Sequence, residues 1–159
     1  MVKTGIGQDS HRFAAQGSVK KLVLGGVEIP GHRGLEGNSD ADVVLHALTN
    51  AVSGVTGVNI LGARSDELCL KQGVTDSAVY LREALATLAP YELTHVCVAV
   101  ECSTPKLAPH IEAMKRSIAR LCGLTASGVG ITATSGEGLT AFGRGEGIQS
   151  FVVVTAQGG

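Results

Sequence analysis

Hydrophobic and polar residues alternate in several stretches of the chain, and this pattern predicts strands. Val96, Val98 and Val100 alternate with Cys97 and Ala99, and this period of two is typical of a strand. Similar short runs bounded by turn residues predict four more strands, at residues 2–8, 21–29, 129–134 and 148–155.

Three helices are predicted between these strands. The first follows a glycine-rich loop at residues 31–38, is capped by Ser39 or Asp40, and ends at about Ser53. Residues 55–75 show only weak periodicity, and we expect them to form a loop.

The other two helices are predicted from apolar residues three and four positions apart. Thr75 or Asp76 can cap the second helix. The third begins near Lys106, and Gly123 is the left-handed residue expected just beyond its end. The apolar faces consist of Leu81, Leu85 and Leu88 in the second helix and of Ile111, Met114, Ile118 and Leu121 in the third.

These elements predict an α/β fold, an α+β sandwich whose mixed four- to five-stranded sheet carries three helices on one face. The 159 residues are expected to form a single domain, because no linker, composition break or repeat divides them. The chain has 22 glycines and only 3% aromatic residues. Because such small side chains allow close packing, we expect the other face of the sheet to pack against copies of itself.

Charge and cysteine content argue against several classes of protein. Only 17% of the residues are charged and the net charge is −1, which disfavours nucleic acid or an anionic membrane as the main partner. No apolar run approaches the roughly 18 residues that span a bilayer, and no apolar signal segment opens the sequence. The cysteines form no C-x-x-C pair and are expected to be reduced, mostly core residues of a cytoplasmic protein. They are Cys69, Cys97, Cys102 and Cys122.

Asp9, His11 and His46 form the strongest candidate for a chemical site. Asp9 and His11 are two positions apart in a predicted strand, so their side chains point to the same face. His46 follows Asp42 by one turn at the start of a predicted helix. Two imidazoles and one carboxylate with a fourth position left open are typical of a catalytic zinc site. The alternative is that His11 is a surface residue and Asp9 caps a turn.

Residues 136–147 form a glycine-rich segment that is similar to a phosphate-binding loop. The Lys-Ser/Thr pair of such loops is absent, because Arg144 and Gly145 follow Gly143. Glu137 and Arg144 could still hold a cation and an anionic group. The alternative is an ordinary glycine-rich turn between two strands.

Residues 103–110 form a junction at which a strand ends and a helix begins. Exposed backbone N–H groups and Lys106 at such a junction suit a nucleotide or a phosphate. The alternative is an ordinary connection. His110 is expected to be structural.

Taken in order, these segments resemble the 2-C-methyl-D-erythritol 2,4-cyclodiphosphate synthase family of the non-mevalonate isoprenoid pathway. The resemblance runs nearly from end to end of the chain. The matching stretches are residues 7–13, 24–30, 39–48, 105–107, 109–110 and 143–147.

The resemblance implies a lyase that assembles as a homotrimer with active sites at subunit boundaries. One subunit supplies the zinc ligands, which match Asp9, His11 and His46. The neighbouring subunit supplies a cytidine pocket that matches Cys102, Ser103, Thr104, Pro105, Lys106, Leu107, Ala108, Thr134 and Gly136.

The implied reaction is an intramolecular phosphoryl transfer. The 2-phosphate of 4-diphosphocytidyl-2-C-methyl-D-erythritol 2-phosphate attacks the β-phosphate, and CMP leaves. Zinc acts as a Lewis acid, and a second cation, Mg²⁺ or Mn²⁺, is held by phosphate oxygens near Glu137. By the resemblance, the catalytic positions are Asn38, Ser135 and Glu137.

The chain departs from the family pattern mainly where the methylerythritol phosphate is expected to bind. Asn38 replaces a usual histidine, and Ile60 replaces a carboxylate expected to bind sugar-alcohol hydroxyls. Asn50 stands where family members often have Asp. The substrate-binding positions implied by the resemblance are Ser39, Ile60, Leu61, Gly62, Ser65, Asp66, Glu67, Ala141 and Arg144.

Three hypotheses follow. The chain is a working synthase, or it is a diverged paralogue that keeps metal and cytidine-nucleotide binding with another substrate or no catalysis. The third is an unrelated structural trimer in which the Asp/His set is accidental.

Overall fold

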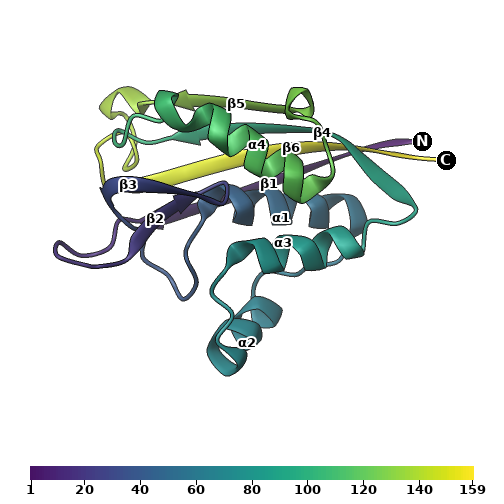
Figure 1. Ribbon diagram of the computed structural model, residues 1–159, viewed down its shortest axis with the longest axis horizontal. Coiled ribbons are helices and arrows are strands. Elements are labelled where there is room, and N and C mark those ends of the chain that lie inside the picture. The colour runs from purple at the N-terminus through teal and green to yellow at the C-terminus, as the bar shows by residue number, and fades with distance from the viewer.

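The computed structural model describes residues 1–159, and a four-stranded mixed sheet forms its main layer (Figure 1). The strand order is β1-β6-β4-β5, with β4 and β5 parallel and the other neighbours antiparallel. The strands predicted at residues 2–8, 96–100, 129–134 and 148–155 all lie within this sheet, and the mixed α/β architecture is confirmed. The bounds are Val2–Arg12 for β1, Tyr91–Glu101 for β4, Val129–Thr134 for β5 and Gly147–Gly158 for β6.

The single strand predicted at residues 21–29 is wrong, because the chain turns back inside it. β2 (Lys21–Leu24) and β3 (Val27–Arg33) form a separate two-stranded hairpin. Gly25 and Gly26 have φ angles of 62° and 77°, which only glycine adopts readily, and they make the turn.

Four helices are present rather than the three predicted, and the first differs at both ends. α1 (Val43–Thr56) begins after Asp42, whose carboxylate accepts from the N–H groups of Val44 and Leu45. Ser39 and Asp40 are therefore not its caps. The helix ends at Gly57, where φ is 76°.

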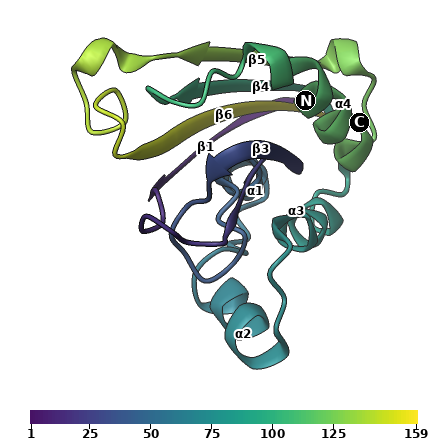
Figure 2. The same ribbon diagram turned by 60° about the vertical axis from the view of Figure 1, so that its left-hand side comes forward.

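α2 (Ala63–Gln72) lies within the stretch that was expected to be a loop. Its periodicity is weak because Leu68 is its only buried residue. Local features hold the helix instead: the Ser65 hydroxyl bonds the N–H and the carbonyl of Gly62, and Gly73 ends the helix. Figure 2 shows α2 as the element furthest from the sheet.

The remaining helices follow the prediction more closely. α3 (Ser77–Ala86) is capped by Asp76. α4 (Ile111–Cys122) ends at Gly123 in the left-handed conformation, as expected. Its predicted start near Lys106 is wrong, because residues 108–110 form a 3₁₀ turn that contains Pro109, which has no N–H to donate.

The helices all lie on one side of the sheet, where α1 packs directly against β1 and β6 and α4 packs against β5. Val96, Val98 and Val100 of β4 are buried on that face, whereas Cys97 on the other face is exposed. A Cβ on Gly5 of β1 would lie only 2.0 Å from the backbone oxygen of Ala51 in α1. This contact between backbones sets the distance between β1 and α1.

The outer face of the sheet carries exposed apolar side chains. Ile6 is 66% exposed and Phe151 is 44% exposed, and Val2 and Val153 are exposed beside them. All four cysteines are free, as predicted. The expectation that they are mostly core residues is wrong, since only Cys102 is buried. None of the helices combines the length and the apolar character that a membrane-spanning helix needs.

Candidate metal centre and substrate pocket

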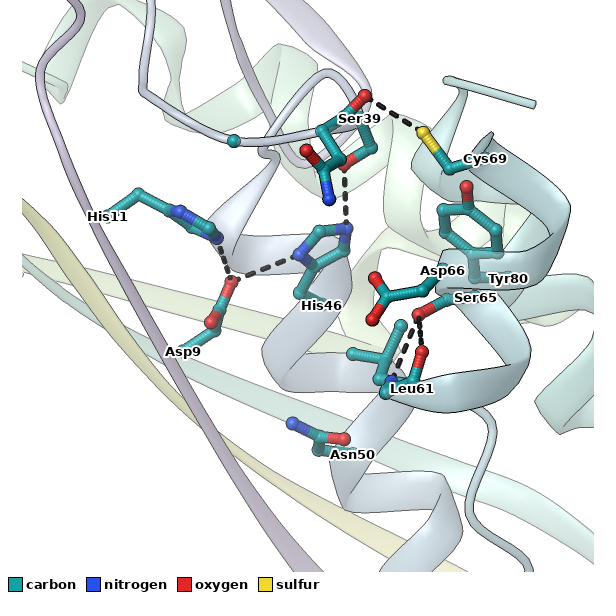
Figure 3. Close-up of a pocket in the computed structure, with 13 residues that line it drawn as sticks. Asp9, His11, Ser39, His46, Asn50, Leu61, Ser65, Asp66, Cys69 and Tyr80 are labelled. Atoms are coloured by element: carbon teal, nitrogen blue, oxygen red, sulfur yellow. Dashed lines mark hydrogen bonds and ion pairs between the residues drawn. The ribbon is translucent and has the colours of Figure 1, made fainter. Parts of the chain in front are cut away.

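Asp9, His11 and His46 meet where β1 passes the first turn of α1 (Figure 3). Asp9 Oδ2 lies 3.2 Å from His11 Nε2 and 3.1 Å from His46 Nδ1. One ligand atom from each residue lies within 4.8 Å of the other two. The predicted convergence of these three side chains is confirmed.

The start of α1, which carries His46, is held in place by Asp42. This fully buried carboxylate accepts N–H bonds from Gly25 and Gly26 in the hairpin turn as well as from α1. Burial raises the pKa of Asp42 to about 6, against the lowering effect of the N–H bonds from Leu45 and Gly26. Asp42 therefore fastens the β2–β3 turn to the helix that positions His46.

Electrostatics at the centre favour a bound cation. Burial acts to raise the pKa of Asp9, but its hydrogen bonds to His11 and His46 and their charge outweigh burial and lower it below 3.8. The bond to Asp9 raises the pKa of His11 above 6.5, although burial opposes this rise. A carboxylate that stays ionised between two imidazoles fits the ligand chemistry of a divalent transition metal.

The centre opens into a polar pocket of about 350 Å³, lined by 13 residues. Asp9, His11 and His46 are among them. The structure brings six other predicted site residues to the same pocket, namely Asn38, Ser39, Leu61, Gly62, Ser65 and Asp66. Figure 3 shows the Asp66 side chain directed into the pocket from α2.

Four residues of this pocket were not predicted as site residues, namely Gly37, Asn50, Cys69 and Tyr80. Cys69 of α2 donates through Sγ to the carbonyl of Asn38 at 2.9 Å, and Tyr80 of α3 lies beside it in the wall. Asn50, noted above only as a departure from the family, also lines it. Cys69 was missed because α2 was expected to be a loop. Its glycine boundaries, Gly62 and Gly73, were the available signal.

Other predicted substrate positions lie elsewhere. Ile60 is buried and does not line the metal pocket. Glu67 is exposed outside this pocket, and its Oε1 lies 4.0 Å from Lys71 Nζ. Ala141 lines a neighbouring pocket of about 260 Å³ that shares His11 with the metal centre. Arg144 is exposed and lies 3.5 Å from Glu146.

Most predicted cytidine-binding residues gather in a pocket of about 280 Å³. It is lined by Cys102, Ser103, Pro105, Lys106, Leu107, Ala108, Ala133, Thr134 and Ser135. Thr104 does not line it, and its hydroxyl faces His32 Nε2 at 3.2 Å. No lining residue is shared with the metal pocket, so the two form separate surfaces of one chain.

The short turn at residues 136–138 follows this pocket. Glu137 has a φ of 52°, a left-handed conformation that is uncommon for a residue with a side chain. Its carboxylate accepts from the Ser135 hydroxyl at 3.4 Å. Gly136 packs closely on Gly143, since a Cβ on Gly136 would lie 2.8 Å from the Gly143 Cα. The glycine-rich segment is thus folded back on itself, with Glu137 exposed.

Known proteins resemble the whole chain. The profile of the YgbB family matches residues 2–157. The 2-C-methyl-D-erythritol 2,4-cyclodiphosphate synthase of Chlamydia muridarum (strain MoPn / Nigg) is 50% identical over 154 residues, which cover 96% of this chain and 86% of that protein. A solved 2C-methyl-D-erythritol-2,4-cyclodiphosphate synthase matches with a TM-score of 0.86 at 31% identity, over 98% of this chain and 100% of that one. A CDP-bound form of such a synthase matches with a TM-score of 0.78 at 30% identity, over 98% and 100% of the two chains.

Proposed function

The chain belongs to the YgbB family, and we propose that it converts 4-diphosphocytidyl-2-C-methyl-D-erythritol 2-phosphate to 2-C-methyl-D-erythritol 2,4-cyclodiphosphate and CMP. The convergence of Asp9, His11 and His46 beside a polar pocket is the observation that carries this proposal. A relative with 50% identity that is named for this synthase supports it over the paralogue hypothesis. Residues 1–159 act as one domain in this proposal.

Asp9, His11 and His46 are proposed to hold a zinc ion. When bound, zinc supplies a Lewis acid that withdraws charge from phosphate oxygens and orients them. A second cation, Mg²⁺ or Mn²⁺, is proposed to bind mainly to the substrate phosphates, with the exposed Glu137 carboxylate as its protein contact.

The reaction needs positioning and charge neutralisation rather than a covalent enzyme intermediate. An oxygen of the 2-phosphate forms a bond to the β-phosphorus. The bond from that phosphorus to the bridging oxygen breaks, and the bridging oxygen leaves on CMP. The Asn38 amide can donate a hydrogen bond to the phosphates, and Lys106 and Arg144 are proposed to offset their negative charge.

The methylerythritol hydroxyls are proposed to bind to α2. Ile60 is buried and offers no acceptor, but Asp66 and Ser65 line the pocket. The Asp66 carboxylate has no ion-pair or hydrogen-bond partner in the protein, and the side chain is directed into the pocket. A carboxylate without a protein partner can accept hydrogen bonds from the hydroxyl groups of a polyol. A hydroxyl group that gives up its water on binding and finds no acceptor would lose about 1–3 kcal/mol of binding free energy.

A homotrimer with its active sites at the subunit boundaries is proposed from two observations. The exposed apolar residues Ile6, Phe151 and Val153 give the outer face of the sheet a surface that a second subunit can bury. The cytidine pocket and the metal pocket share no lining residue within one chain. In a trimer, the cytidine pocket of one subunit can therefore lie next to the metal pocket of its neighbour.

The test is CMP release from the proposed substrate in the presence of Zn²⁺ and Mg²⁺. We expect the wild type to release CMP together with the cyclic diphosphate, and His46→Ala to reduce the rate by at least 100-fold. His110→Ala is the matched control, because it removes an imidazole from the start of α4, outside both pockets. CDP binding by a wild type that forms no product would instead favour the paralogue.

A further inference from the structure

Four side chains form a continuous series behind the metal centre. His46 Nδ1 lies 3.1 Å from Asp9 Oδ2, on the side of the proposed cation. The other ring nitrogen, Nε2, lies 2.8 Å from the hydroxyl of Ser77. That hydroxyl donates to the carboxylate of Asp40. The series Asp9–His46–Ser77–Asp40 thus joins β1, α1, α3 and the segment before α1.

The directions of these hydrogen bonds follow from proton counting. A serine hydroxyl has one proton, and a carboxylate can only accept. Because Ser77 gives its proton to Asp40, its oxygen must accept from His46. His46 therefore carries a proton on Nε2. Without a cation, Nδ1 faces the Asp9 carboxylate as its hydrogen-bond partner; a cation bound between the two side chains would replace the proton of that bond, and the lone pair of Nδ1 would be the one offered to it.

Ser77 is well placed to hold this arrangement. It is fully buried at the first position of α3, and its backbone N–H donates to Asp40 Oδ2 at 3.2 Å. Asp40 is fixed in turn, since its own N–H donates to the Thr75 carbonyl at 2.9 Å. Ser39 also approaches His46 Nε2, but at 3.4 Å, and its oxygen already accepts from Ala41. Ser77 is therefore the main partner of Nε2.

We propose that Ser77, held by Asp40, is a positioning residue that fixes the His46 ring so that Nδ1 is the nitrogen offered to the cation. The inference rests on the proposed metal site but adds two residues that are not ligands and assigns the ligating nitrogen. Partners that orient a ligating histidine are typically worth 10–100-fold in metal affinity.

The first experiment needs no variant. The full-length wild type is labelled with ¹⁵N-histidine and loaded with ¹¹³Cd²⁺, and coupling between the metal and each ring nitrogen is measured by NMR. We expect coupling to His46 Nδ1 and a proton on His46 Nε2 that exchanges slowly with water. Coupling to His46 Nε2 would overturn the proposal.

The second experiment measures Zn²⁺ affinity by competition with a chromogenic chelator. Ser77→Ala is expected to bind zinc 10–100-fold more weakly and to lose the slowly exchanging Nε2 proton. Ser53→Ala is the matched control, because Ser53 is also a buried serine but its hydroxyl has no hydrogen-bond partner. We expect this control to keep wild-type affinity.

The outcomes separate the two proposals. If the wild type binds neither Zn²⁺ nor Cd²⁺, the proposed metal site is refuted, and so is the positioning role of Ser77. If the wild type binds zinc and a folded Ser77→Ala variant shows the same zinc affinity and the same His46 signal, only the positioning role of Ser77 is refuted. Equal weakening in Ser53→Ala would also overturn the role of Ser77, since the effect would then be general loss of packing.

Discussion

Gly7 of β1 and Ala47 of α1 are in such close contact that a Cβ on Gly7 would lie 1.9 Å from the Ala47 carbonyl oxygen. Ala47 directly follows His46, and Asp9 is two residues beyond Gly7 in the strand. The absence of a side chain at Gly7 therefore sets the distance across which the carboxylate and the imidazole meet.

Gly7→Ala should accordingly push α1 away from β1. We expect the free energy of unfolding to fall by about 3 kcal/mol or more, the upper end of the usual cost of overpacking. The cost is high because the added methyl group would meet the backbone of α1, which cannot move aside as a side chain can. Zinc affinity should fall as well. Urea unfolding measures the first effect. Gly130→Ala in β5 is the control, since no heavy atom lies within 4 Å of a Cβ there, and equal stability of the two variants would contradict the argument.

Asp42 should make the stability of the protein depend on pH in an unusual direction. Its pKa is about 6 in the folded protein and about 3.8 in the unfolded chain, so the folded state binds more protons between these values. Stability from this group is therefore present below about pH 4 and is lost as the pH rises through 6. Asp42→Asn should remove this slope in urea unfolding from pH 4 to 7. An identical slope in the variant would show that other groups cause it.

Asp42→Ala tests the structural role of the same residue. Loss of the carboxylate removes the cap of α1 and leaves the buried N–H of Gly25 without an acceptor. We expect a cost of about 2–4 kcal/mol in the free energy of unfolding, from a lost cap and an unpaired buried donor. Asp76→Ala is the comparison, because it caps α3 but is itself exposed and bonds only the Ala78 N–H. It should cost only about 1 kcal/mol.

His11 provides a direct test of the electrostatics of the centre. Its pKa is raised above 6.5 mainly by the hydrogen bond to Asp9, so the stability that this pair adds is complete below pH 6.5 and is lost as the pH rises through the folded pKa. In Asp9→Asn the pKa of His11 should fall, because the remaining burial favours the neutral ring. NMR titration of the metal-free protein measures this shift, and an unchanged pKa would remove the argument for a shared cation site.

The fold and the centre could be predicted from the sequence where the signal is local. Alternation within 96–100 marked β4, and the spacing of Asp9 and His11 in a strand placed both side chains on one face. Features that depend on contacts across the fold were missed. α2 buries only Leu68, so its sequence carries almost no periodicity, and the bond of Ser77 to His46 joins two helices whose packing no local pattern reveals.

Asp66 should affect substrate binding without affecting the metal. The proposed role predicts that Asp66→Asn raises KM by about 5–150-fold, the equivalent of 1–3 kcal/mol for a hydroxyl whose acceptor is weakened, while zinc affinity stays at the wild-type value. Glu67→Gln is the adjacent control, since Glu67 lies outside the pocket. KM is measured by steady-state kinetics on the proposed substrate. Equal KM values for the two variants would show that the substrate hydroxyls do not bind to Asp66.

The outer face of the sheet should determine the assembly. Ile6 and Val153 are paired across β1 and β6, and both are exposed on this face. Val153→Asp would place a charge on the surface that is proposed to be buried between subunits, at a cost of several kcal/mol per copy if it stayed there unpaired. We expect light scattering to show that the mass in solution shifts from trimer to monomer. CMP release should be lost, but zinc should still bind, because the three ligands belong to one chain.

Val19→Asp is the control. This residue is 98% exposed and lies outside the sheet, so the variant should remain an active trimer. A Val153→Asp variant that remains an active trimer would exclude this face as the subunit boundary.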